Sequence, residues 1–137
     1  MFRHLLLAFT LIATTALGIC AMEHTSDPLD QVKAAVEAGK AVMLDVREQG
    51  EWDAGHLAKA QLIPLSALSK DVATLAAGLP KDKPIYIHCK AGGRCLAAAE
   101  LLKPLGYDVR PLKAGFGELV KNGFTPAEPT KTGPATK

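Results

Sequence analysis

Short apolar runs alternate with amphipathic segments along this chain of 137 residues. Four short, mostly apolar runs are typical of strands: 41–46, 62–65, 85–87 and 108–112. Four segments with apolar residues at helical spacing predict helices: 29–38, 70–77, 95–102 and 115–121. Because strands and helices alternate, the sequence predicts a single α/β domain at 27–124, with a mainly parallel central sheet and helices on both faces.

The residues between these segments predict where the elements begin and end. Asp27 is expected to cap the first helix, with Pro28 at its first position and Gly39 at its end. Residues 47–55 are polar and predict a loop rich in turns, and Ser66 is expected to cap the turn before the helix at 70–77. The segment 125–137 is rich in Pro, Thr and Lys, so we expect a disordered tail there.

The first 21 residues predict a secretory signal peptide. A short positive head at 1–4 precedes an apolar run at 5–20, and small residues follow around Ala21. The run is shorter than the roughly 20 residues that span a membrane, which favours a cleaved signal over an uncleaved anchor. Lipidation at Cys20 is disfavoured because Ile19 is bulky where a lipoprotein signal carries a small residue. We therefore expect a periplasmic protein.

Charge and cysteine content exclude several classes of function. The 16 basic and 14 acidic residues are scattered, and single lysines give no footprint for nucleic acid. Beyond the predicted signal only Cys89 and Cys95 remain, too few for a disulfide scaffold. In an oxidising compartment such a pair must be reactive, bridged or kept reduced by a thiol-reducing protein. The spacing of His88, Cys89 and Cys95 does not fit a zinc site. No metal site is therefore expected, and we also expect a monomer without an organic cofactor.

The segment 85–95, IYIHCKAGGRC, reads as a strand, a tight loop and the start of a helix. Cys89 would face unpaired backbone amides, the positive end of a helix dipole and the cations of Lys90 and Arg94. Each of these favours the thiolate, which is the nucleophilic form. The glycines at 92–93 would let the backbone amides approach a group on the sulfur. The sequence thus predicts that Cys89 is a nucleophile.

The length of the loop bears on the chemistry. Cysteine phosphatases place five residues between their cysteine and arginine, whereas only four separate Cys89 from Arg94, and Cys95 stands where the longer loop has its arginine. The smaller cradle suits a terminal sulfur atom on Cys89. A Cys-dependent phosphatase or arsenate reductase, a thiol redox enzyme, and a sulfur-carrier or binding module without turnover stay open as alternatives, although the chain lacks the Cys-x-x-Cys of thioredoxin-like enzymes.

The loop HCKAGGRC at 88–95 is similar to the active-site loop of rhodanese-domain sulfurtransferases. The segment 45–64, DVREQGEWDAGHLAKAQLIP, resembles the second signature of that family. The two motifs stand in the family's order, and the likeness covers most of 42–116. The closing segment keeps a glycine and Phe116 of the family motif but has no tryptophan after them. The likeness is to small, single-domain, exported members with a rhodanese-like fold.

This resemblance implies a sulfurtransferase that takes sulfane sulfur from a small anion such as thiosulfate, carries it as a persulfide on Cys89 and passes it to cyanide or a thiol. It also implies that Asp45 and Arg47 brace the loop. This agrees with the position of Asp45 in an apolar strand, because a buried carboxylate is costly unless it has a partner. Cys95 departs from the Ser or Thr common in the family and is a candidate resolving thiol for oxidised Cys89. The loop residues expected to bind substrate are Lys90, Ala91, Gly92, Gly93 and Arg94.

Overall fold

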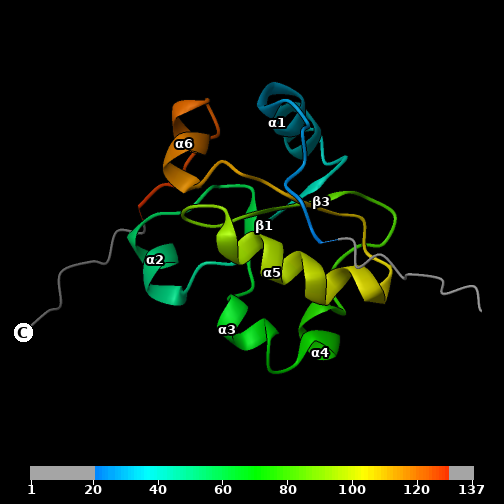
Figure 1. Cartoon of the computed structure of the whole chain (residues 1–137). Coiled ribbons are helices and arrows are strands. Elements are labelled where there is room, and N and C mark those ends of the chain that lie inside the picture. The colour runs from blue at the N-terminus through cyan, green and yellow to red at the C-terminus, as the bar shows by residue number, and fades with distance from the viewer. Residues whose placement is uncertain (1–20, 130–137) are drawn as a thin grey trace, which may run out of the picture.

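A computed structural model describes residues 21–129, so the predicted signal peptide lies outside the described residues except for Ala21. The central sheet has four strands in the order β2, β1, β3, β4, and every neighbouring pair is parallel (Figure 1). The strands are β1 (Val42–Asp45), β2 (Ala60–Leu62), β3 (Ile85–His88) and β4 (Val109–Pro111). The prediction of a parallel α/β sheet is confirmed, with β4 at an edge as the proline in its sequence favours.

Helices cover both faces of the sheet, as predicted. In Figure 1, α1 and α6 lie on one face, and α3, α4 and α5 lie on the other. The helices are α1 (Leu29–Glu37), α2 (Gln49–Ala54), α3 (Leu65–Leu68), α4 (Val72–Ala76), α5 (Gly93–Leu102) and α6 (Phe116–Lys121), and a 3-10 turn, η1 (Lys103–Leu105), follows α5. No helix within residues 21–129 has the length and apolar character that crossing a membrane requires.

The two faces of the sheet carry separate apolar cores. On β1, Leu44 belongs to the core under α5, whereas Met43 belongs to the core under α1. On β3, Ile85 and Ile87 face the first core and Tyr86 faces the second. Successive side chains of a strand point to opposite faces. Strands buried on both faces therefore need the nearly continuous apolar runs seen in the sequence.

The prediction that Asp27 caps α1 is wrong. Pro28 occupies the N-cap position, and the Asp27 carboxylate instead accepts hydrogen bonds from the hydroxyl of Tyr86 at 2.7 Å and from Arg110 at 3.0 Å. These contacts tie the start of α1 to β3 and β4, and they lower the pKa of Asp27, the Tyr86 hydroxyl acting most strongly. Gly39 does end the helical turn, with a left-handed φ of +70°.

Two helices differ from the sequence prediction. The segment 47–55 contains α2, which begins with a capping box in which Glu48 and Glu51 exchange side-chain and backbone hydrogen bonds. The predicted helix at 70–77 is present as the shorter α4, which Asp71 caps, and the unpredicted α3 precedes it. Ser66 lies inside α3, where its hydroxyl donates to Glu48 at 2.7 Å, so its predicted capping role is wrong.

The folded domain extends a few residues past 124, where the disordered tail was predicted to begin. The amide of Ala58 donates to the Thr125 carbonyl at 2.9 Å, and the amide of Ala127 donates to the His56 carbonyl at 2.8 Å. Leu57 and Pro126 form an antiparallel bridge between these two segments. Residues 125–127 therefore belong to the folded domain, whereas 130–137 lie outside the described residues.

Candidate active site

Cys89 follows β3 directly, and α5 begins at Gly93, so the loop that carries the cysteine lies at the carboxyl ends of the parallel strands. This is the edge where α/β sheets place their ligands. The turn into α5 depends on Gly92, whose φ of +92° is a left-handed value that side chains disfavour. Cys89 is only 1% exposed and belongs to the apolar core under α5.

Hydrogen-bond donors surround the Cys89 sulfur. The Gly92 amide donates to Sγ at 3.0 Å. The pKa of Cys89 is lowered to about 4, chiefly by a hydrogen bond from the Cys95 thiol and further by the backbone amides of Cys95, Ala91 and Gly92. Burial acts in the opposite direction but is outweighed. Cys89 is therefore a thiolate at neutral pH, which is the form that attacks sulfur or phosphorus.

Cys95 lies in the first turn of α5 and is completely buried. Its Sγ is 2.8 Å from the Gly92 carbonyl and 3.1 Å from the Leu112 carbonyl. The neighbouring Cys89 sulfur and burial raise the pKa of Cys95, so this residue stays a thiol. Both cysteines are free. A buried thiol whose proton is held by carbonyls and a thiolate is a weak nucleophile, so the geometry favours a hydrogen-bond donor over the predicted resolving thiol.

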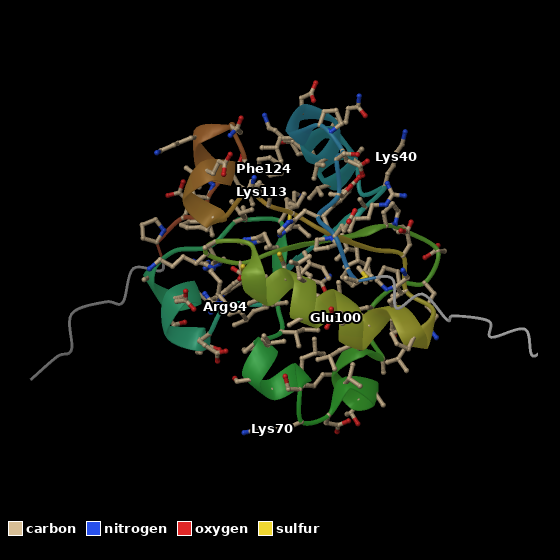
Figure 2. The ribbon with its side chains drawn as sticks, in the orientation of Figure 1. Lys40, Lys70, Arg94, Glu100, Lys113 and Phe124 are labelled. Carbon is tan, nitrogen blue, oxygen red and sulfur yellow. The ribbon has the colours of Figure 1, made fainter. Side chains whose placement is uncertain are left out.

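Arg94 is paired with an acidic residue of a neighbouring helix. Its guanidinium makes a bidentate ion pair with Glu51 of α2, with Nη1 to Oε2 at 2.6 Å and Nη2 to Oε1 at 2.8 Å. Figure 2 shows Arg94 between α2 and the start of α5. The hydrogen bond from Arg94 is the main reason that the pKa of Glu51 falls to about 2. The expected anion-binding arginine is thus already paired.

Lys90 instead lies between two depressions beside the loop. One has a volume of about 310 Å³, and Arg47, Glu51 and Phe116 share its wall with Lys90. The other is wider, with a volume of about 910 Å³. Lys90 and Ala91 line it from the loop, and the rest of its wall comes from the 112–121 segment, which includes Lys113 and Lys121, and from the chain around the start of α1. The exposed ammonium group of Lys90 is therefore placed to meet an anion that approaches from either side.

Asp45 and Arg47 form a buried brace behind the loop. Asp45 Oδ2 accepts from Arg47 Nη2 at 2.7 Å, and both residues are buried. The same guanidinium donates to the Gly55 carbonyl at 2.8 Å and lies 4.5 Å from the centre of the Phe116 ring. The Phe116 amide in turn donates to the Cys89 carbonyl at 3.0 Å. A continuous set of contacts therefore joins the Asp45 carboxylate to the backbone of Cys89.

His88 is buried next to this brace. Its Nε2 lies 3.6 Å from Asp45 Oδ2, and neither ring nitrogen has a hydrogen-bond partner among residues 21–129. Burial lowers the pKa of His88, so the ring is neutral. Within those residues no three acidic, histidine or cysteine side chains gather as metal ligands.

Sequence reasoning missed three residues that shape the loop. Glu51 lies within the segment that resembles the family signature, but its pairing with Arg94 joins residues 43 positions apart. Gly115 packs so closely that a Cβ there would stand 1.8 Å from the Lys90 carbonyl oxygen. His24 Nε2 reaches the Gly92 carbonyl at 2.8 Å, and an isolated histidine near the N-terminus gives no signal of such a contact.

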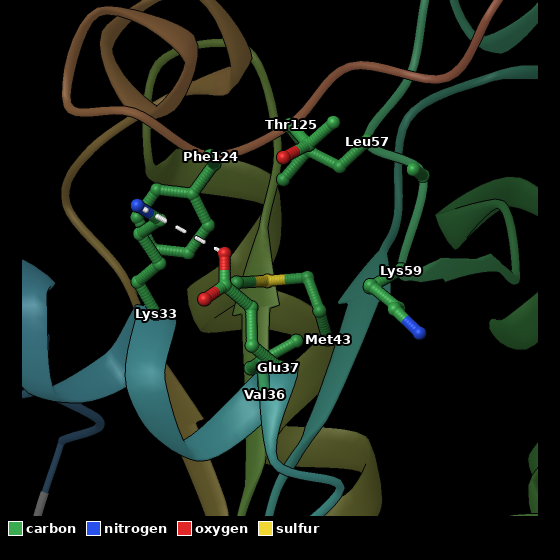
Figure 3. Close-up of a pocket in the computed structure, with 9 residues that line it drawn as sticks. Lys33, Val36, Glu37, Met43, Leu57, Lys59, Phe124 and Thr125 are labelled. Carbon is green, nitrogen blue, oxygen red and sulfur yellow. Dashed lines mark ion pairs between the residues drawn. The ribbon is translucent and has the colours of Figure 1, made fainter.

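A separate cavity of about 300 Å³ is lined by residues of α1, of β1, of the segment before β2 and of the segment after α6, and it shares no residue with the loop (Figure 3). Its walls are largely apolar and include Met43, Leu57 and Phe124. An ion pair between Lys33 and Glu37, with 3.9 Å between Nζ and Oε1, lies at its border. The cavity is thus distinct from the Cys89 site in both place and chemistry.

Comparison with known proteins gives consistent matches. A profile of the rhodanese-like domain family matches residues 28–122. The chain is 37% identical over 78 residues to the uncharacterized protein YqhL of Bacillus subtilis, which covers 56% of this chain and 59% of YqhL. It is 32% identical over 102 residues to the thiosulfate sulfurtransferase GlpE of Pseudomonas fluorescens, which covers 74% of this chain and 87% of GlpE. The chain thus spans less than two thirds of YqhL but most of GlpE.

Solved structures agree with these matches. The rhodanese-like domain of the Anabaena protein Alr3790 superposes with a TM-score of 0.64 and 27% identity, covering 85% of this chain and 88% of that domain. The human single-domain sulfurtransferase TSTD1 superposes with a TM-score of 0.58 and 29% identity, covering 68% of this chain and 92% of TSTD1.

Proposed function

This chain belongs to the rhodanese-like domain family, and we propose that it is a sulfurtransferase that moves sulfane sulfur from thiosulfate or a similar donor to cyanide or a thiol acceptor. The observation that carries the proposal is the Cys89 sulfur in its cradle, with the Gly92 amide at 3.0 Å and a pKa lowered to about 4. The likeness to the thiosulfate sulfurtransferase GlpE supports thiosulfate as the donor.

The reaction proceeds in two displacements at sulfur. The Cys89 thiolate attacks the outer sulfur of thiosulfate, a new S–S bond forms, and the S–S bond of the donor breaks so that sulfite leaves with the electron pair. Cyanide or a thiolate then attacks the terminal sulfur of the persulfide, and the Cys89 thiolate leaves. With cyanide the product is thiocyanate. Dividing one transfer into two covalent steps is the usual benefit of a polarizable nucleophile.

The loop supplies the charge stabilisation for both steps. The Gly92 amide, and with it the amides of Ala91 and Cys95, would follow the negative charge as it moves to the terminal sulfur of the persulfide. Donors fixed in advance in this way are worth roughly 3 kcal/mol each in acyl-transfer enzymes. Lys90, which borders both depressions, would attract the anionic donor toward the loop. Because Cys89 is 1% exposed, the reacting atom of the donor must enter the loop to meet the sulfur.

Phosphatase or arsenate reductase chemistry fits this geometry poorly. A phosphoryl or arsenate group carries several charged oxygens and needs an arginine fork to hold them. Both terminal nitrogens of Arg94 are engaged by Glu51. A thiol redox cycle would need Cys95 as a second nucleophile, and its raised pKa opposes this role.

One assay separates these functions. The purified protein is given thiosulfate with cyanide and, separately, p-nitrophenyl phosphate. We expect thiocyanate release that Cys89→Ser abolishes, whereas Cys95→Ser retains activity because the serine hydroxyl still donates a hydrogen bond. Phosphate release without thiocyanate would favour the phosphatase. One equivalent of persulfide on Cys89 without turnover, seen by mass spectrometry, would indicate a sulfur carrier.

We further propose that the protein works in the periplasm as a monomer and is kept reduced by a thiol-reducing protein. This proposal rests on the apolar run at 5–20 and on the two reactive-loop cysteines. Cell fractionation with N-terminal sequencing of the recovered protein tests the location. We expect the sequence to begin after Ala21; recovery from the cytoplasm with residues 1–21 intact would contradict export.

A further inference from the structure

The segment that precedes α1 lies against the active-site loop. The Thr25 amide donates to the Pro111 carbonyl at the end of β4, at 2.8 Å, and Met22 packs against the core under α5. These two contacts hold His24 between them. Its Nε2 lies 2.8 Å from the Gly92 carbonyl oxygen, a contact between residues 68 positions apart. The segment is therefore fixed where it touches the loop.

Gly92 connects this segment to the reactive sulfur. Its amide donates to Cys89 Sγ at 3.0 Å, whereas its carbonyl oxygen receives His24 Nε2 and Cys95 Sγ, each at 2.8 Å. A carbonyl oxygen has two lone pairs, so two donors satisfy it. One residue thus binds the sulfur through its amide and is held in place through its carbonyl.

The backbone at Gly92 needs such a restraint. A glycine at φ +92° and ψ −12° has more accessible conformations than any other residue, so nothing in its own chemistry fixes the direction of its amide. A Cβ at this position would stand 3.0 Å from His24 Nε2 and 3.1 Å from the Lys113 carbonyl. The loop must therefore use glycine here, and the freedom of that glycine is removed by contacts to its carbonyl.

We propose that His24 is a positioning residue of the sulfur-transfer site: its hydrogen bond to the Gly92 carbonyl fixes the peptide that follows Gly92, and so restrains the glycine whose own amide, in the preceding peptide, is directed at the Cys89 sulfur. This inference rests on the proposed function for its catalytic meaning. The neutral Nε2–H tautomer and the imidazolium both donate from Nε2, so the contact holds in either charge state. The residues that directly follow the predicted signal are then part of the site.

His24 also affects the Cys95 thiol. Cys95 has one S–H proton, and the Gly92 carbonyl, the Leu112 carbonyl and the Cys89 thiolate compete for it. With His24 donating to the Gly92 carbonyl, that oxygen remains hydrogen-bonded when the thiol proton turns toward Cys89. Without His24, the carbonyl holds the Cys95 proton more often, and the thiolate loses its main donor. Both effects predict a less stable Cys89 thiolate in the absence of His24.

The test compares His24→Ala with His24→Gln, whose side-chain amide can donate from a similar place. Glu23→Gln is the matched control, because Glu23 is exposed on the same segment. The full chain is alkylated with iodoacetamide across pH about 3 to 9, and the rate at Cys89 is read by mass spectrometry. Trypsin cleavage after Lys90 and Arg94 puts Cys89 and Cys95 on different peptides.

We expect the midpoint of Cys89 alkylation to rise by about half to one pH unit in His24→Ala, as the loss of one neutral hydrogen bond predicts. His24→Gln should recover most of the shift, and Glu23→Gln should match the wild type. A His24→Ala midpoint within about 0.2 pH units of the wild type would overturn the inference, as would an equal shift in Glu23→Gln. The measurement needs no sulfur donor, so its outcome is independent of whether thiocyanate is formed.

Discussion

Replacing Asp45 with asparagine tests the brace behind the loop. The Asp45 carboxylate is fully buried and accepts from the Arg47 amide at 2.9 Å, from Nε at 3.0 Å and from Nη2 at 2.7 Å. Asparagine keeps the shape but leaves a buried guanidinium without a counter-charge. Removing one partner of a buried pair costs about 3–5 kcal/mol. Arg47 keeps its contacts with the Gly55 carbonyl and the Phe116 ring, so we expect the lower end, about 3 kcal/mol.

Urea unfolding of Asp45→Asn, compared with the wild type, measures this cost. Asp53→Asn is the control, since Asp53 is exposed and accepts a hydrogen bond from Gln49 at 2.8 Å within one helix. Such exposed pairs contribute about 0.5 kcal/mol or less. If the free energies of unfolding of the two variants differ by less than about 1 kcal/mol, the buried pair does not stabilise the fold as argued.

Three further predictions concern the loop. The rate at which Cys89 is alkylated should increase with pH through a midpoint near pH 4 and be constant above about pH 6. A midpoint of about 8.5, the ordinary value for a thiol, would contradict the prediction that Cys89 is a thiolate at neutral pH. Glu51→Gln should lower the KM for thiosulfate by about threefold in steady-state kinetics at low salt, because Arg94 loses its ion pair and can face the thiosulfate dianion. An unchanged or higher KM would show that Arg94 cannot reach thiosulfate. Gly115→Ala should prevent stable folding, as measured by thermal unfolding, because the added Cβ would overlap the Lys90 carbonyl oxygen. Gly117→Ala is the control: this glycine of α6 has open space around it, so the change should stabilise the protein by about 0.5–1 kcal/mol. Equal melting temperatures for the two variants would refute the clash.

The parts of the fold that sequence predicted are those fixed by burial. The runs at 41–46 and 85–87 became β1 and β3 because both faces of the sheet are covered, which requires apolar residues at successive positions. The helix α2 was missed because none of its residues is buried and its start depends on a local capping box. Asp27 was misassigned because its partners, Tyr86 and Arg110, lie 59 and 83 residues away.

The same distinction applies to the site. The strand, loop and helix around Cys89 were predicted because they are adjacent in sequence, so the turn between them depends on local residues. Contacts between residues that lie far apart in the sequence could not be predicted in this way. Arg94 has the spacing of an anion-binding residue, but Glu51 occupies it from another helix. His24 contacts the loop only because the chain before α1 passes over β4.

The pairing of Arg94 changes which groups stabilise charge in the loop. With that guanidinium held by Glu51, the donors left at the Cys89 sulfur are backbone amides and the Cys95 thiol, all of them neutral. Neutral donors grouped around one atom stabilise a single localised negative charge. A thiolate and the terminal sulfur of a persulfide each carry such a charge. A phosphoryl or arsenate group held on Cys89 would spread two charges over several oxygens and would need the arginine as a counter-ion, whereas the oxygens of thiosulfate leave with sulfite. The ion pair between α2 and α5 therefore favours sulfur over phosphoryl transfer, in addition to the short loop.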